Sequence, residues 1–265
     1  MTIAHSPSRG REWFERLTGA TTGPVGSLLS AGAGLGGEEA HFLAVVPDPD
    51  GKFPRARQGE VGLEEAWNLA AEIRRTVAAD ADRAAGRPII AVVDVPSQAY
   101  GYREELVGLH QALAGAAGAY ATARLAGHPV VAFLVGKAIS GGFLSHGLQA
   151  NRLVALDDDA VQVQVMSKQS AARITRRTIA ELDAAAEKVP ATAYDGASFA
   201  KLGALHRLLP GDADTAAVRA ALAEAVADAR RGPRDLSTRL ASPEAVRARA
   251  ASIEVRRRLA AAWRD

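Results

Sequence analysis

The chain has 265 residues, a formal net charge of +2 and no cysteine. This length favours one large domain, and the lack of cysteine excludes disulfides, thiolate metal sites and a cysteine nucleophile. With 48% hydrophobic and 23% charged residues, the composition is typical of a soluble globular protein. The longest apolar runs, 88–93 and 129–135, are too short to span a bilayer, and the amino terminus lacks an apolar export signal. We therefore expect a cytoplasmic protein without a membrane partner.

Residues 1–40 are expected to form an irregular lead-in, followed by a single domain over 41–265 that ends in helices. A short amphipathic piece around Trp13 precedes a glycine- and alanine-rich stretch that ends at Gly37. A dinucleotide-binding loop follows a strand and opens a helix, whereas here a predicted strand comes after the glycines. This stretch is therefore interpreted as a flexible connector.

Beyond this lead-in, strands and helices are expected to alternate. The apolar residues of 63–83 fall on one stripe of a helix, and 104–125 predicts a second helix rich in alanine and glycine. Apolar or alternating runs predict strands at 42–46, 88–93, 129–135, 152–156 and 161–166. Further helices are predicted at 142–150, 170–175, 178–188, 214–231 and 243–263. Nearly continuous apolar strands separated by helices predict an α/β fold, with a mostly parallel sheet covered on both faces.

Two loops, 94–101 and 136–143, follow buried strands at the edge of the sheet where α/β proteins place their sites. Gly141 and Gly142 allow a ligand to approach the backbone closely. A helix that starts at Gly142 would direct free N–H groups at a carboxylate or an enolate oxygen. The alternative is a strand-to-helix turn that needs glycine only for packing. A similar loop one strand earlier favours the functional interpretation.

Other catalytic chemistries find no support in the sequence. Ser140 does not lie in a nucleophile elbow, because Ala138 stands where G-x-S-x-G requires glycine. The aspartates 157–159 are interpreted as a turn, since no complementary metal ligands accompany them. His110 and His128 are interpreted as structural or exposed residues, and no metal site is expected.

The end of the chain is rich in arginine, with ten arginines against five acidic residues from Asp228 onward. One interpretation is a patch for an acidic protein or a phosphate-bearing arm. The other, which we favour, is the solvated face of two terminal helices. Only 5% of the residues are aromatic, so nothing indicates stacking on nucleic acid.

Four segments resemble a known family. DVPSQAYGYREE at 94–105 and VAFLVGKAISGGF at 131–143 resemble the carboxyltransferase branch of the crotonase superfamily. More closely, the chain resembles the gamma subunit of biotin-independent malonate decarboxylase. The segments VMSKQSAARIT at 165–175 and RGREWFERLTG at 9–19 also resemble that subunit. The resemblance extends over about residues 9–210, with the four motifs in the same order.

This resemblance implies a crotonase-like (ClpP/crotonase) ββα spiral, in which peptide N–H groups of two successive loops form an oxyanion hole. Biotin carboxyltransferases have glycine where this chain has Ser97, and tyrosine-glycine where it has Ile139 and Ser140, so the sequence favours a decarboxylase over biotin handling. The expected catalytic residues are the backbone groups of Gln98, Ala99, Gly141 and Gly142, with Ser140 or Gln98 as orienting side chains. The expected substrate-binding residues are Ser97, Lys137 and Lys168.

The resemblance also implies a heteromeric lyase of malonate catabolism, active only with a beta-type subunit that completes the site. Its substrate would be a malonyl thioester on an acyl carrier protein whose arm is a phosphoribosyl-dephospho-coenzyme A group. Loss of CO2 would leave an acetyl thioester, which a separate carrier-protein transferase exchanges for malonate. No biotin and no cofactor bound covalently by this chain are expected. Two alternatives stay open: a carboxyltransferase subunit of a biotin-dependent carboxylase or decarboxylase, and a non-catalytic partner subunit.

Overall fold

The computed structural model describes residues 8–263, except for the side chain of Leu240. Within these residues, a seven-stranded sheet has the order β1-β2-β3-β4-β5-β7, and β6 pairs with β4 beside this path. Only β1 and β2 pair in antiparallel fashion; the other pairs are parallel. The strands are β1 (Leu28–Leu35), β2 (Glu38–Val45), β3 (Ile89–Val95), β4 (Val130–Ile139), β5 (Arg152–Asp157), β6 (Gln162–Gln164) and β7 (Arg207–Pro210).

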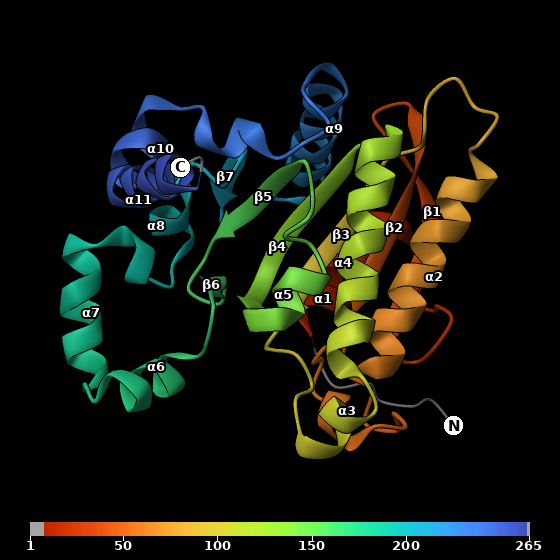
Figure 1. Cartoon of the computed structure of the whole chain (residues 1–265). Coiled ribbons are helices and arrows are strands. Elements are labelled where there is room, and N and C mark those ends of the chain that lie inside the picture. The colour runs from red at the N-terminus through yellow and green to blue at the C-terminus, as the bar shows by residue number, and fades with distance from the viewer. Residues whose placement is uncertain (1–7, 264–265) are drawn as a thin grey trace.

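Helices cover both faces of the sheet, as expected for an α/β fold. Helices α2 and α4 lie side by side in front of the sheet in Figure 1, whereas α1 and α9 pack against its strands and contact each other. Most of the remaining helices form a group beyond β5 and β6 (Figure 1). The helices are α1 (Arg9–Thr18), α2 (Leu63–Ala79), α3 (Tyr102–Leu106), α4 (Leu109–Ala126), α5 (Ser140–Ser145), α6 (Lys168–Thr175), α7 (Ile179–Lys188), α8 (Gly196–Lys201), α9 (Thr215–Arg231), α10 (Pro243–Ala248) and α11 (Ala250–Ala262), with 3-10 turns at Pro54–Ala56, Pro190–Thr192 and Ser237–Leu240.

The core lies between the central strands and the helices on either side. Residues 89–93 of β3 and 130–136 of β4 are buried without interruption, because neither face of these parallel strands meets solvent. Trp13 of α1 packs edge-on against Phe133 of β4, with ring centroids 5.3 Å apart, and this contact fastens α1 under the sheet. The predicted buried strands are therefore confirmed.

The expected irregular lead-in over residues 1–40 is wrong for its described part, 8–40. The glycine-rich segment forms strand β1, and Gly36 and Gly37 make the hairpin turn with φ of +60° and +88°. Strand β2 begins at Glu38 and so crosses the expected boundary at residue 40. Alanine and glycine disfavour strands, which concealed β1; its pairing with β2 supplies the stability that composition does not.

Several boundaries also differ from the predictions. The expected helix 104–125 is two helices, because Gly108 adopts φ +91° between α3 and α4. The expected helix 243–263 is likewise divided at Arg249. Strand β4 continues to Ile139 rather than ending at residue 135, since its last residues pair with β6. Helix α5 consequently begins at Ser140, not at Gly142.

No helix within residues 8–263 combines the length and the apolar character that crossing a bilayer requires.

Candidate functional site

The loop after β3 is held in place by Val61, which precedes helix α2. The Val61 N–H donates to the carbonyl of Ser97 at 3.1 Å, and the Ala99 N–H donates to the carbonyl of Val61 at 2.9 Å. Gln98 lies between these two bonds in a parallel bridge, so its own N–H faces away from Val61. That N–H has no hydrogen-bond partner in the described part of the chain.

The second loop runs from the end of β4 into helix α5 and presses against the first. Ser140 has φ +59°, a left-handed conformation that residues other than glycine rarely adopt. Gly142 lies in the first turn of the helix, where an N–H has no partner inside the helix. A Cβ added to Gly142 would lie 2.4 Å from the carbonyl oxygen of Ser97 and 3.3 Å from the nitrogen of Gln98. Only glycine fits this contact, which places the two loops together.

The side chain of Gln98 joins the loops by a direct hydrogen bond. Its Oε1 accepts from the Gly141 N–H at 2.9 Å. The Gly141 N–H is therefore engaged, as is that of Ala99, which donates to Val61. Of the four backbone amides expected to serve catalysis, those of Gln98 and Gly142 are the pair without a hydrogen-bond partner within residues 8–263.

Asp94 connects the end of β3 to two other elements. Its Oδ1 accepts from the Lys137 N–H at 3.0 Å and its Oδ2 accepts from the Gly10 N–H at 3.2 Å. The carboxylate therefore ties the last part of β4 and the start of α1 to the base of the first loop. From the sequence, Asp94 was predicted only as part of the loop 94–101. A carboxylate directly after a predicted buried strand was the signal for its structural role.

Glu65 supports the first loop from behind and was missed in the sequence. Its side chain is buried and accepts from the Ser27 hydroxyl at 2.6 Å and from the Gly62 N–H at 2.9 Å. Burial raises the pKa of this carboxyl. The bond to Gly62 closes the start of α2 beside Val61, so Glu65 fixes the segment on which the loop lies. A glutamate in the first turn of a predicted helix was the signal for this role.

His146 holds α5 against the sheet instead of serving Ser140. Its ring is fully buried, Nε2 donates to the carbonyl of Val92 at 3.0 Å, and Nδ1 accepts from the Tyr120 hydroxyl at 2.9 Å. Burial lowers the pKa of His146 to about 4, so the ring is neutral near pH 7. Burial has the opposite effect on the Tyr120 hydroxyl, whose charged form is the anion, and raises its pKa. Both ring nitrogens of His146 are engaged, so the ring is not available as a base for Ser140.

A mainly apolar cavity of about 220 Å³ lies beside Ser140 and Gly141. It separates α5 from β6 and from the segments that follow it. Few polar groups reach this space, so a charge placed in it would be poorly solvated. Its apolar lining comes from Phe143, Leu144, Leu148, Val163, Val165, Pro190, Ala191, Ala193, Phe199 and Leu202.

The expected substrate-binding residues do not all lie together. Ser97 borders Gly142, and its hydroxyl donates to the carbonyl of Gln98 at 2.7 Å. Lys137 is exposed on β4. Lys168 lines a separate cavity of about 470 Å³, where its Nζ pairs with Asp183 at 2.7 Å. A substrate contact by Lys168 stays a prediction that this placement does not favour.

No group of three or more His, Asp or Glu side chains within residues 8–263 is arranged to hold a metal ion. Asp158 and Asp159 form the turn after β5, as predicted, whereas Asp157 is the last residue of that strand. Asp158 accepts from the Ala160 N–H at 2.7 Å and pairs with Arg9 at 3.0 Å. The hydrogen bond from Ala160 and the pairing with Arg9 lower the pKa of Asp158. This carboxylate therefore has a structural role.

The architecture defines an α/β protein of crotonase-like fold. A chain of transcarboxylase 12S superposes with a TM-score of 0.60 at 19% identity, covering 78% of this chain and 36% of that one, which shows the fold alone. Residues 56–263 match the family model described as the malonate decarboxylase gamma subunit. The chain therefore belongs to the malonate decarboxylase gamma subunit family.

Two further relatives are much closer in sequence. A chain in the crystal structure of a Pseudomonas malonate decarboxylase hetero-tetramer in complex with coenzyme A is 54% identical, with a TM-score of 0.88 over 97% of this chain and 100% of that chain. The malonyl-S-ACP:biotin-protein carboxyltransferase of Malonomonas rubra is 36% identical over 161 residues, or 60% of this chain. That match includes 55% of the relative, so the chain spans about half the length of this curated protein.

Proposed function

We propose that this chain is a subunit of a malonate decarboxylase and that, with a beta-type subunit, it forms the site that decarboxylates a malonyl thioester on an acyl carrier protein. The observation that carries the proposal is the juxtaposition of the N–H groups of Gln98 and Gly142 in contacting loops, both without a hydrogen-bond partner within residues 8–263. Membership of the family adds the substrate class.

Decarboxylation of a malonyl thioester requires little acid–base equipment. The bond between the α-carbon and the carboxylate breaks, and its electron pair moves into the thioester as an enolate. The N–H groups of Gln98 and Gly142 would donate to the enolate oxygen as its charge develops. One such preorganised donor contributes about 3–4 kcal/mol to the transition state. Protonation of the α-carbon then yields the acetyl thioester.

The apolar cavity beside Gly141 supports this chemistry. A carboxylate loses solvation in such surroundings, whereas the neutral CO2 that it becomes does not. The side chain of Gln98 already spans the two loops and would orient the thioester through its amide nitrogen. Ser140, whose backbone is held at φ +59° beside the cavity, is the second orienting side chain.

A partner subunit would complete the site. Helices α6, α7 and α11 contain no buried residue in this chain, although α6 and α7 expose Ile174 and Ile179. Val165, at the rim of the cavity, is 69% exposed. The Pseudomonas relative was crystallised as a hetero-tetramer. We propose that the beta-type subunit covers this apolar face and closes the cavity, so that the chain alone is inactive.

The remaining features of the proposal follow the family. They are an acyl carrier protein with a phosphoribosyl-dephospho-coenzyme A arm, a separate carrier-protein transferase, no biotin, and a cytoplasmic location. The second candidate function is carboxyl transfer to a biotin-bearing protein. It is favoured by the name of the Malonomonas rubra relative, a malonyl-S-ACP:biotin-protein carboxyltransferase.

Reconstitution tests the proposal. Conversion of a malonyl carrier-protein thioester to the acetyl thioester is measured with the chain alone, with its beta-type partner, and with the pair plus a biotin-bearing acceptor protein, in the presence and absence of avidin. We expect the pair to form the acetyl thioester and CO2 without the acceptor and unaffected by avidin. Conversion that requires the acceptor and is blocked by avidin would favour carboxyl transfer to biotin, and no conversion by any mixture would refute both candidate functions.

A further inference from the structure

A cavity of about 620 Å³ lies at the opposite edge of the sheet from the candidate site. It is bounded by the carboxyl-terminal ends of α2, α4 and α9 and by residues that precede β4 and β5. Its volume is within the range of small-molecule sites. The charged or titratable side chains that line it are Asp80, Arg83, Arg124, His128, Arg230 and Arg234.

Arg124 is a buried cation without an acidic partner. Its residue is only 7% exposed, and no carboxylate lies within 4 Å of its guanidinium in the described part of the chain. Nε donates to the carbonyl of Gln149 at 3.1 Å, and Nη1 donates to the carbonyl of Arg234. Burial lowers the pKa of Arg124, and the charge of Asp235 offsets this only in part. A buried charge that lacks a counter-charge is costly, so this position favours an anion.

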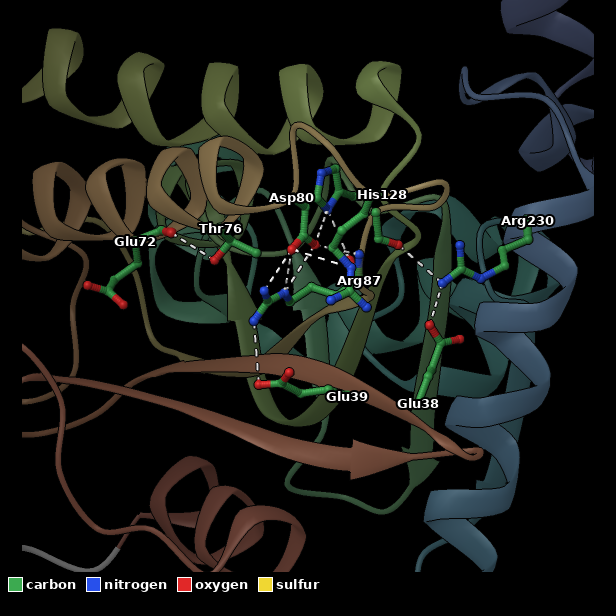
Figure 2. Close-up of polar contacts among 10 residues, drawn as sticks. Glu38, Glu39, Glu72, Thr76, Asp80, Arg87, His128 and Arg230 are labelled. Carbon is green, nitrogen blue, oxygen red and sulfur yellow. Dashed lines mark hydrogen bonds and ion pairs between the residues drawn. The ribbon is translucent and has the colours of Figure 1, made fainter.

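Two further arginines approach the same cavity with free N–H groups. Nη2 of Arg230, on α9, forms an ion pair with Glu38 (Figure 2) and donates to the carbonyl of Gly86, whereas Nη1 and Nε have no partner within residues 8–263. Arg234 donates from Nη1 to the carbonyl of Leu125 at 3.0 Å, and its other N–H groups are free in the same sense. Arg230 is thus held by an ion pair with Glu38 and by one carbonyl, and Arg234 by one carbonyl. Both guanidinium groups keep further donors for a ligand.

The carboxylate in the cavity does not neutralise these arginines. The side chain of Asp80 is fully buried and pairs with Arg87 at 2.7 Å, while the Arg87 N–H donates to it at 2.8 Å. His128 donates from Nδ1 to the carbonyl of Arg87 at 3.0 Å and completes this cluster (Figure 2). Burial alone would raise the pKa of Asp80, but the hydrogen bonds from Arg87 outweigh it and lower that pKa. The charge of Asp80 is thus committed to Arg87.

Backbone carbonyl groups accept hydrogen bonds from only some of the N–H groups of Arg124, Arg230 and Arg234. The carbonyl of Leu125, in the last turn of α4, accepts one N–H of Arg234, and other backbone carbonyls accept two donors of Arg124 and one of Arg230. The remaining donors form a set that matches the oxygens of a phosphate, which planar guanidinium groups bind in bidentate fashion. Alanines contribute the uncharged part of the wall, including Ala81, Ala84 and Ala126.

We propose that this cavity binds a phosphate-bearing small molecule, with the phosphate against Arg124, Arg230 and Arg234 and an uncharged portion against the alanines. Strand β3 separates the cavity from the loop of Gln98 by roughly 20 Å, given the rise per residue of a strand. The ligand is therefore not the thioester of the proposed reaction, and this second site does not depend on the proposed function.

Calorimetric titration of the full chain, alone and with its beta-type partner, tests the proposal. The probes are inorganic pyrophosphate, ADP and, as the uncharged control, adenosine. We expect pyrophosphate and ADP to bind, adenosine to bind at least 10-fold more weakly than ADP, and added salt to weaken binding. No binding of either phosphate compound, or equal binding of ADP and adenosine, would overturn the proposal.

Variants locate the site within the chain. Arg230→Gln and Arg234→Gln should each raise the Kd for ADP about 10-fold, since each removes a charge-assisted hydrogen bond. Arg231→Gln is the matched control, because this neighbour on α9 makes the same change in charge outside the cavity. Arg234 is exposed, so its variant should remain folded even if another does not. Equal affinity of the Arg234→Gln and Arg231→Gln chains would refute the assignment.

Discussion

Replacing Gly142 by alanine tests the contact that brings the two loops together. The added Cβ would lie 2.4 Å from the carbonyl oxygen and 2.7 Å from the carbonyl carbon of Ser97. Both are backbone atoms, so the loops must separate by roughly 1 Å to reach ordinary van der Waals contact. Misplacement of this size costs about 100-fold in rate, and loss of one oxyanion donor costs 100- to 1,000-fold. We therefore expect CO2 release by the reconstituted pair to fall at least 100-fold.

Two other glycines provide matched controls for this variant. Gly141→Ala meets only the side-chain end of Gln98, at 3.1 Å, so it should lower turnover less than Gly142→Ala. Gly118→Ala has no atom within 4 Å on the exposed side of α4, so it should leave turnover unchanged and raise stability by about 0.5–1 kcal/mol. Circular dichroism and co-elution with the partner verify folding and assembly. A folded Gly142→Ala complex with wild-type turnover would refute the reasoning and favour a non-catalytic role.

Three further predictions concern buried or bridging side chains. Because the folded-state pKa of His146 is about 4, below its unfolded value of 6.5, the unfolded chain takes up the proton first on acidification. Stability should fall by about 3 kcal/mol as the pH decreases from 6.5 to 4, and urea unfolding of His146→Gln should lack this contribution; equal slopes would contradict it. Gln98→Ala keeps the backbone N–H but loses the bond to Gly141, so turnover should fall about 5-fold, well short of Gly142→Ala. Glu65→Ala leaves the Ser27 hydroxyl and the Gly62 N–H without their acceptor and should lower the free energy of unfolding by about 1–3 kcal/mol, measured by thermal denaturation. Glu65→Gln should have a smaller effect. A Glu65→Ala chain as stable as the wild type would contradict the role of these two buried hydrogen bonds.

The sequence predicts the central strands well because β3 and β4 are buried on both faces and so consist of continuous apolar residues. Strand β1 escapes prediction because its alanine and glycine residues carry no strand signal, and its conformation comes from pairing with β2. The extension of β4 to Ile139 depends on β6, which lies further along the chain. The residues within a strand do not report its pairing with another strand, whether that strand is adjacent, as β2 is to β1, or further along the chain.

The candidate site is likewise predictable from the sequence only in part. The two loops and the glycines that let them touch are predictable, because each follows a buried strand. Which amides stay free is not predictable, because that depends on Val61, which engages the Ala99 N–H, and on the rotamer of Gln98, which engages Gly141. The pairing of Lys168 with Asp183 is likewise a contact made only in the folded chain.

The most direct test of the central claim is the infrared stretching frequency of a thioester carbonyl bound at the site. An isotope-labelled acetyl carrier-protein thioester, which cannot lose CO2, is added to the complex of this chain with its beta-type partner. If the N–H groups of Gln98 and Gly142 donate to the carbonyl oxygen, the frequency should decrease on binding to the wild-type complex and return toward the free value in Gly142→Ala. A bound wild-type carbonyl with the frequency of the free thioester would contradict the account.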